Sequence, residues 1–80
     1  MLDELKNANK VVGAKQSYRA AENGRVRKAF IAQDADERVV GSFKKLCNER
    51  GITIEYVNSM KELGKACNID VGSAVAVILK

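Results

Sequence analysis

Hydrophobic and polar positions divide the chain into segments that alternate between helical and extended patterns. Helix formers and apolar residues at helical spacing predict helices over residues 2–9, 14–23, 37–50 and 59–68. Short apolar or alternating runs predict strands over residues 11–12, 29–32, 52–57 and 74–79. This order predicts an α/β protein, a three-layer α/β/α sandwich around a central, mostly four-stranded mixed sheet.

Residues at the segment ends support this division. Asn23-Gly24 and Gly51 are typical helix stops, and Ser59 with Glu62 forms the sequence pattern of a capping box. The carboxylates of the 34–36 turn are expected to cap the helix that follows them. In the first helix, Leu2, Leu5 and Ala8 are expected on the inner face, and the apolar strand 29–32 is expected to be buried on both faces.

The length of 80 residues, 46% of them hydrophobic, predicts one domain over residues 1–80 that can form its own core. The longest apolar run, Ala74 to Leu79, is too short to span a membrane. Residues 1–10 lack the basic and apolar regions of a signal peptide. We therefore expect a cytoplasmic protein, with monomer as the default state.

Several kinds of chemistry are disfavoured. The chain has no histidine, and Cys47 and Cys67 stand far apart, so we expect no metal site and thiols that fill apolar space. The neighbouring acids Asp34, Asp36 and Glu37 suit a helix start better than an active site. The chain also lacks a G-x-G-x-x-G or G-K-[ST] phosphate loop. An enzyme, a cofactor and a small-molecule substrate are not expected.

Two segments are candidates for binding. The balance of 14 basic and 10 acidic residues, net +4, permits a phosphate-rich partner but equally suits simple solubility. Gly13 precedes a helix start whose first turns hold Lys15, Gln16 and Arg19, and cations there oppose the helix dipole unless an anion binds. These residues either form a phosphate site or are solvated surface.

The second candidate is the loop over residues 67–73, which carries two apolar side chains. Ile69 and Val71 either tuck into the core or stand exposed to cover an unstacked base. Both candidate segments adjoin strands at one edge of the expected sheet, so they could be neighbours in space.

Three motifs together resemble the kink-turn RNA-binding family of the ribosomal protein L7Ae type (L7Ae/L30e-like), closest to its small bacterial, YbxF-like branch. The motifs are Gly13-Ala14-Lys15-Gln16-x-x-Arg19, Ala32-Gln33-Asp34-Ala35-Asp36 and the run from Leu63 to Gly72. The resemblance implies an α/β/α sandwich that binds duplex RNA bent at a bulge followed by tandem sheared G·A pairs.

By this resemblance, Gly13, Lys15, Gln16 and Arg19 would face the G·A pairs. Ile69, Asp70 and Val71 would pack against the extruded bases, and Lys28 would contact a phosphate. Many relatives have Gly-Thr-Asn-Glu where this chain has Gly13-Ala14-Lys15-Gln16, and an amide in place of a carboxylate should weaken guanine recognition.

The sequence thus predicts a non-enzymatic, ribosomal-protein-like RNA binder that stabilises bent RNA. The target, whether ribosomal RNA, a riboswitch or another structured RNA, stays open. Two alternatives remain: a protein-interaction module of the same fold without specific RNA binding, and a redox role for Cys47 or Cys67.

Overall fold

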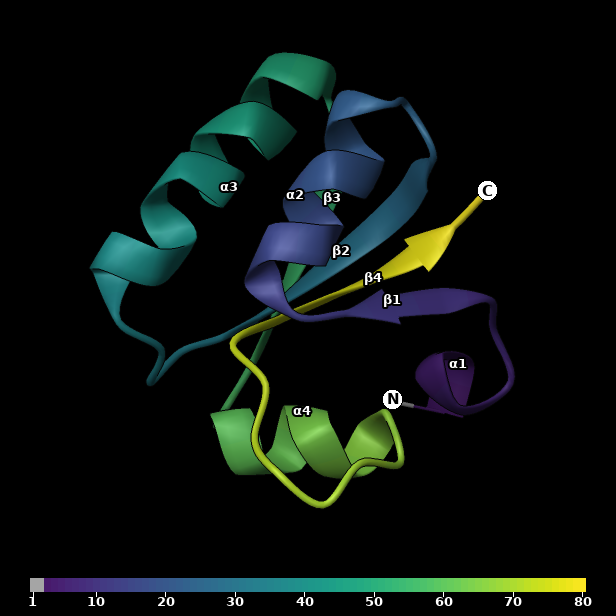
Figure 1. Cartoon of the computed structure of the whole chain (residues 1–80), viewed down its shortest axis with the longest axis vertical. Helices are drawn as coiled ribbons and strands as arrows, with labels where there is room; N and C mark the ends of the chain where they lie inside the picture. The colour runs from purple at the N-terminus through teal and green to yellow at the C-terminus, as the bar shows by residue number, and fades with distance from the viewer. Residues whose placement is uncertain (1–2) are drawn as a thin grey trace.

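A computed structural model describes residues 3–80 of the chain and has four helices and four strands in alternation (Figure 1). The elements are α1 (Asp3–Lys6), β1 (Lys10–Val12), α2 (Ala14–Glu22), β2 (Val26–Ala32), α3 (Glu37–Arg50), β3 (Thr53–Val57), α4 (Met60–Ala66) and β4 (Val75–Leu79). The predicted order of elements is therefore confirmed.

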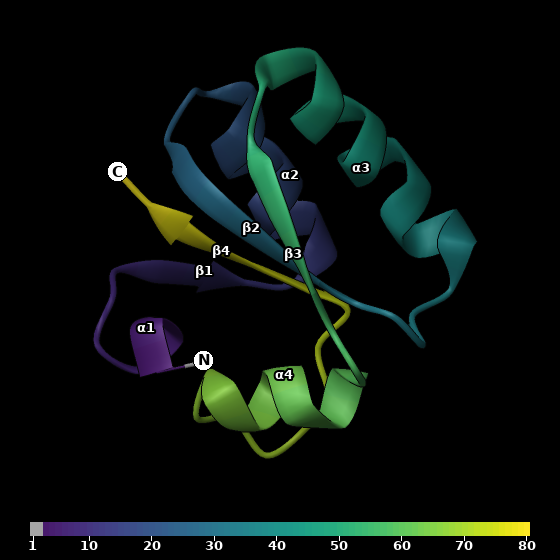
Figure 2. The same cartoon turned by 180° about the vertical axis from the view of Figure 1, so that it is seen from behind.

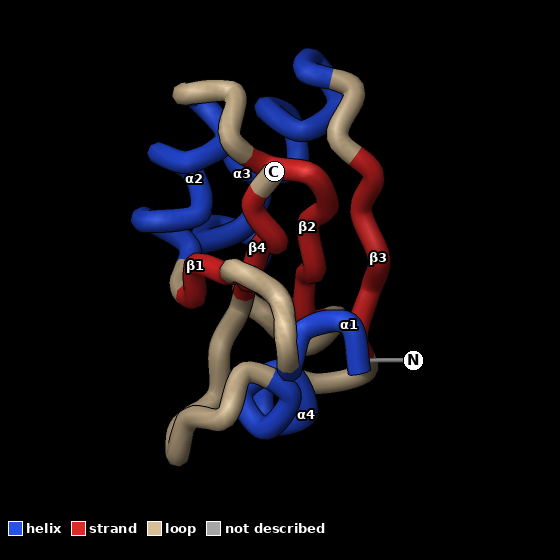
Figure 3. The backbone as a smooth tube through the Cα atoms, turned by 90° about the vertical axis from the view of Figure 1, so that its right-hand side faces the viewer, coloured by secondary structure: helices blue, strands red, loops and turns tan. Residues whose placement is uncertain are grey.

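The strands form one mixed sheet in the order β1-β4-β2-β3. β4 runs antiparallel to both of its neighbours, and β2 pairs with β3 in parallel through the α3 crossover. Helices α2 and α3 cover one face, and α1 and α4 cover the other (Figures 1 and 2). Figure 3 shows the strands lying between these two pairs of helices, which confirms the three-layer sandwich.

Each face of the sheet has its own hydrophobic core. On the α2/α3 face, Ile31, Val77 and Phe43 are buried, and on the α1/α4 face, Leu5, Phe30 and Leu63 are buried. Successive residues of a strand point to opposite faces, so β2 and β4 supply both cores. This explains why residues 29–32 are buried throughout, as predicted.

Strand β2 is three residues longer than predicted, because Val26, Arg27 and Lys28 also belong to it. Two charged residues in succession hide a strand from a hydrophobicity pattern. Leu5 is fully buried and Ala8 packs against the same core, as predicted, whereas Leu2 lies outside the described residues. Within residues 3–80, no helix is long and apolar enough to cross a membrane.

Two acids of the 34–36 turn cap different helices. The Asp36 carboxylate accepts a hydrogen bond from the backbone N–H of Arg38 (2.8 Å) and caps α3, as predicted. Asp34 instead accepts from the N–H of Met60 (2.8 Å), the first residue of α4, so its predicted role at α3 is wrong. Asp34 therefore links the end of β2 to α4 across 26 positions of sequence.

Candidate nucleic-acid interface

Two segments far apart in sequence meet at one end of the sheet. The N–H of Gly13, after β1, donates to the carbonyl of Val75 (2.8 Å), at the start of β4 just after the 67–73 loop. The N–H of Ala32 donates to the carbonyl of Ala74 (2.9 Å), which ties the end of β2 to the same place. The start of α2 and the apolar loop are thus neighbours, as the sequence suggested (Figure 1).

The start of α2 is open to an anionic ligand. Gly13 adopts φ 107°, a backbone conformation that side chains disfavour, and the space beside its Cα is empty. No side chain caps α2, and its first turn contains no acid. Helix N-terminal amides and the dipole then present uncompensated positive charge at this end of the sheet.

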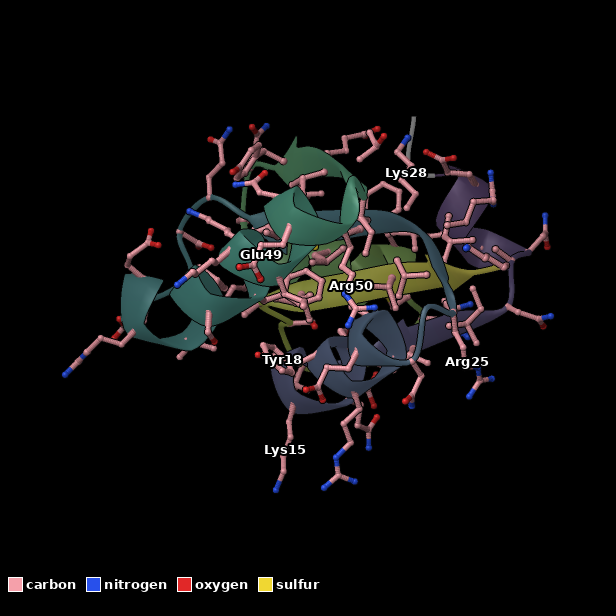
Figure 4. The ribbon with its side chains drawn as sticks, turned by 90° about the horizontal axis from the view of Figure 1, so that it is seen from above. Lys15, Tyr18, Arg25, Lys28, Glu49 and Arg50 are labelled. Carbon is pink, nitrogen blue, oxygen red and sulfur yellow. The ribbon has the colours of Figure 1, made fainter. Side chains whose placement is uncertain are left out.

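Lys15, Gln16 and Arg19 are exposed on the outer face of α2. Within residues 3–80, neither Lys15 nor Arg19 has an ion-pair partner. Both line a shallow hollow of about 350 Å³ between α2 and α3, with Tyr18 and Ser42 beside them. Figure 4 shows Lys15 extending from the start of α2 into solvent. The structure therefore brings these cations together beside Gly13, as expected.

The two apolar residues of the loop have different environments. Ile69 is half-buried and packs against the α1/α4 core. Val71 is 70% exposed, the most exposed of the large hydrophobic residues identified in the described chain, and Asp70 between them is also exposed. Ile69 therefore packs into the core, as the first alternative had it, and Val71 is exposed, as the second requires.

Close packing against α4 holds the loop in place. The N–H of Ile69 donates to the Gly64 carbonyl (3.0 Å), and the N–H of Ser73 donates to the Met60 carbonyl (3.0 Å). A Cβ added at Gly64 would overlap the carbonyl oxygen of Val71. Gly64 is thus a positioning residue that the sequence reasoning missed. A glycine inside a helix, where alanine is more stable, was the available signal.

The structure does not bring Lys28 to this end of the sheet. Lys28 pairs in register with Ile78 and Thr53, toward the opposite end of the strands. Its Nζ lies 2.7 Å from Glu4 Oε1 and 2.8 Å from Glu55 Oε1, and Figure 4 shows it beside α1, away from Lys15. Hydrogen bonds to these two carboxylates raise its pKa. The structure thus gives Lys28 a place between two acids, apart from the other predicted site residues.

The two thiols lie inside the cores. Cys47 is buried between α3 and the sheet, and Cys67 is buried on the opposite face. Burial raises the pKa of the Cys47 thiol to about 11 and also raises that of Cys67. Both groups are therefore protonated near neutral pH, which disfavours the redox alternative because the thiolate is the reactive form.

Known proteins resemble this chain over nearly its whole length. A model of the Ribosomal protein L7Ae/L30e/S12e/Gadd45 family matches residues 2–80. The RNA-binding protein TTE2299 of Caldanaerobacter subterraneus subsp. tengcongensis is 52% identical over 67 residues, which cover 84% of this chain and 82% of that protein.

Two further relatives extend this likeness. The RNA-binding protein YbxF of Geobacillus stearothermophilus is 40% identical over 70 residues, covering 88% of this chain and 85% of that protein. The solved structure of a Giardia lamblia 15.5kD RNA binding protein matches with a TM-score of 0.90 and 29% identity, covering 99% of this chain and 70% of that one.

Proposed function

Because the chain belongs to the ribosomal protein L7Ae/L30e/S12e/Gadd45 family, in its YbxF-like bacterial branch, we propose that it binds kink-turn RNA and stabilises the bent form. The observation that carries this proposal is the open start of α2, beside an exposed valine on the neighbouring loop. Two cations, Lys15 and Arg19, lie there without an ion-pair partner in the described part of the chain. The function involves no chemical step, and we expect it in the cytoplasm with a monomeric protein.

Charge supplies the affinity of this interface. Lys15 and Arg19 share one face of α2, and the helix start adds the partial positive charge of its free amides. An RNA backbone bound here would neutralise charges that repel each other in the free protein. Binding should therefore weaken as salt concentration rises, because each phosphate contact releases counterions.

Donors at the start of α2 would read the G·A pairs. Guanine presents two acceptors, O6 and N7, on its major-groove edge, and lysine and arginine side chains donate to both. Lys15 and Arg19 supply such donors, and Gln16 adds an amide NH₂ beside them. The missing side chain of Gly13 leaves room for the RNA to approach the backbone closely.

The loop would recognise the bulge. A kink-turn extrudes bases that have lost their stacking partners, and such bases favour apolar contacts. Val71 offers an exposed apolar surface at this place, while Ile69 holds the loop on the core. Since a straight duplex has no extruded base, this contact exists only in the bent state, and binding shifts the RNA population toward that state.

The test is a titration of the protein into a kink-turn RNA labelled at both ends, so that energy transfer reports the bend. A duplex without the G·A pairs is the RNA control. Lys15→Gln and Arg19→Gln should each weaken binding to the kink-turn and lower the slope of log K against log salt by about 0.9 per lost phosphate contact.

Lys45→Gln is the matched protein control, because Lys45 is an exposed cation on α3 outside the proposed interface. Equal and weak binding to both RNAs would contradict the proposal. So would wild-type affinity in both α2 variants. Salt-insensitive binding to a protein, with none to RNA, would favour the protein-interaction alternative.

A further inference from the structure

A second group of cations lines a hollow at the opposite end of the sheet. The hollow has a volume of about 400 Å³, and three basic residues border it: Arg27 from β2, Arg50 from the end of α3, and Lys80 after β4. Its remaining lining is small or apolar and contains no acid: Ala21, Gly24, Val26, Gly51 and Ile52. Helix α2 begins at the first interface and ends beside this hollow, so the two surfaces are separated by the length of that helix.

A β-bulge in β2 places Val26 and Arg27 on the same face of the sheet. Val26 pairs with Leu79 and Lys28 pairs with Ile78, so Arg27 is an extra residue without a partner in β4. In a regular strand, Val26 and Arg27 would point to opposite faces. Here both line the same hollow, because the bulge interrupts this alternation between them.

The basic side chains of this surface form no ion pairs with the described residues of the protein. Within residues 3–80, none of the basic side chains Arg25, Arg27, Arg50 and Lys80 has an ion-pair or hydrogen-bond partner. Arg25 adjoins the hollow, because its carbonyl accepts from the N–H of Lys80 (2.8 Å). Figure 4 shows Arg25 and Arg50 near the C-terminal end of α2, whereas Lys15 extends from its start.

Backbone N–H groups, and not these cations, form hydrogen bonds with carbonyls at the ends of α2 and α3. The N–H groups of Asn23 and Arg25 donate to the carbonyls of Arg19 and Ala20. The N–H groups of Gly51 and Ile52 donate to those of Asn48 and Cys47. Because backbone groups cap both helices, the guanidinium groups remain available to an anion outside the protein.

We propose that this basic hollow binds the phosphate backbone of a second RNA segment, so that the protein joins two parts of a folded RNA. Guanidinium groups bind phosphate oxygens through paired N–H donors, and several arginines side by side suit a polyanion. No aromatic side chain lines the hollow, so contact would be to the backbone and independent of base sequence. The inference rests on the proposed function only for the first RNA contact.

The test starts from the protein saturated with a short kink-turn hairpin, whose arms are too short to reach the hollow. A labelled plain RNA duplex is then added, and fluorescence anisotropy reports a ternary complex. The wild-type complex should bind the duplex in a salt-sensitive manner. Arg27→Gln/Arg50→Gln should weaken duplex binding about tenfold at low salt and lower its salt slope by about 2, while kink-turn affinity stays unchanged.

Lys45→Gln again serves as the control, since Lys45 lies on the same helix as Arg50 but does not line the hollow. A thermal melt checks folding, and Arg27→Gln alone gives a second measurement if the double variant is unstable. Absence of a ternary complex would overturn the inference. A loss in Lys45→Gln as large as in the double variant, or duplex binding unchanged in the double variant, would do the same.

Failure of the kink-turn proposal is distinguishable from failure of this one. If the hairpin does not bind, the free protein and its Lys15→Gln/Arg19→Gln variant are titrated with the plain duplex. Duplex binding that persists in this variant but falls in Arg27→Gln/Arg50→Gln supports the second surface by itself. The reverse pattern overturns it.

Discussion

Replacing Gly64 by alanine should displace the 67–73 loop, because the loop backbone lies directly against this helix position. The new Cβ would overlap the Val71 carbonyl oxygen and lie 3.1 Å from the Cα of Gly72. Both neighbours are backbone atoms, so either α4 or the loop must move. Overpacking of this kind costs about 1–3 kcal/mol of unfolding free energy.

Gly41→Ala is the matched control, since Gly41 is also a glycine inside a helix. Its Cβ would meet only the flexible end of the Glu37 side chain, 3.3 Å away. Removing a helix glycine then stabilises the fold by about 0.5–1 kcal/mol. Because both variants gain this propensity term, their difference isolates the clash, and Tm should differ by about 4–8 °C per kcal/mol.

The displacement should also weaken RNA binding. Full burial of a valine side chain is worth about 1.5–3 kcal/mol, and Val71 has 70% of its surface exposed and available for the contact. Loss of that contact amounts to about 1–2 kcal/mol, or roughly a five- to thirtyfold rise in Kd. Urea unfolding and the kink-turn titration measure the two effects. Equal stability in both variants, with wild-type affinity in Gly64→Ala, would refute the seating of the loop on α4.

Three further outcomes follow from the same structure. Val71→Asp should weaken kink-turn binding by more than the contact loss alone, because it places a negative charge near phosphates, while the melting temperature stays within error; Val39→Asp, at another exposed valine, is the control. Lys28→Gln should leave RNA affinity unchanged and cost at most about 1 kcal/mol of stability, as expected for a partly exposed ion pair. A large loss of affinity would instead support the phosphate contact that the family resemblance implied for Lys28. The Arg38 guanidinium and backbone N–H lower the pKa of Asp36, so its stabilising effect is present above about pH 4 and lost as pH falls through the lowered pKa. Thermal melts of Asp36→Asn and wild type should therefore converge at low pH, and a constant difference would contradict this.

Local signals in the sequence were sufficient to predict the order of elements and the exposed cations at the start of α2. The glycine before α2, the Ser59 cap and the alternation in β3 depend on residues close together in the chain. Such signals report backbone preferences that a short segment expresses alone. The cations of α2 were predictable for the same reason, since a helix start with Lys15 and Arg19 is a purely local feature.

Contacts between distant segments decided the rest. Lys28 of β2 forms ion pairs with Glu4 of α1 and Glu55 of β3, two acids that are distant from it in sequence. Asp34 caps α4 because the end of β2 lies beside the start of that helix. Only the packing of the loop on α4 separated half-buried Ile69 from exposed Val71. Only the bulge in the β2–β4 pairing placed Val26 and Arg27 together beside the basic hollow. The side-chain types were present in the sequence, but which of them face solvent depends on what the folded chain places next to each one.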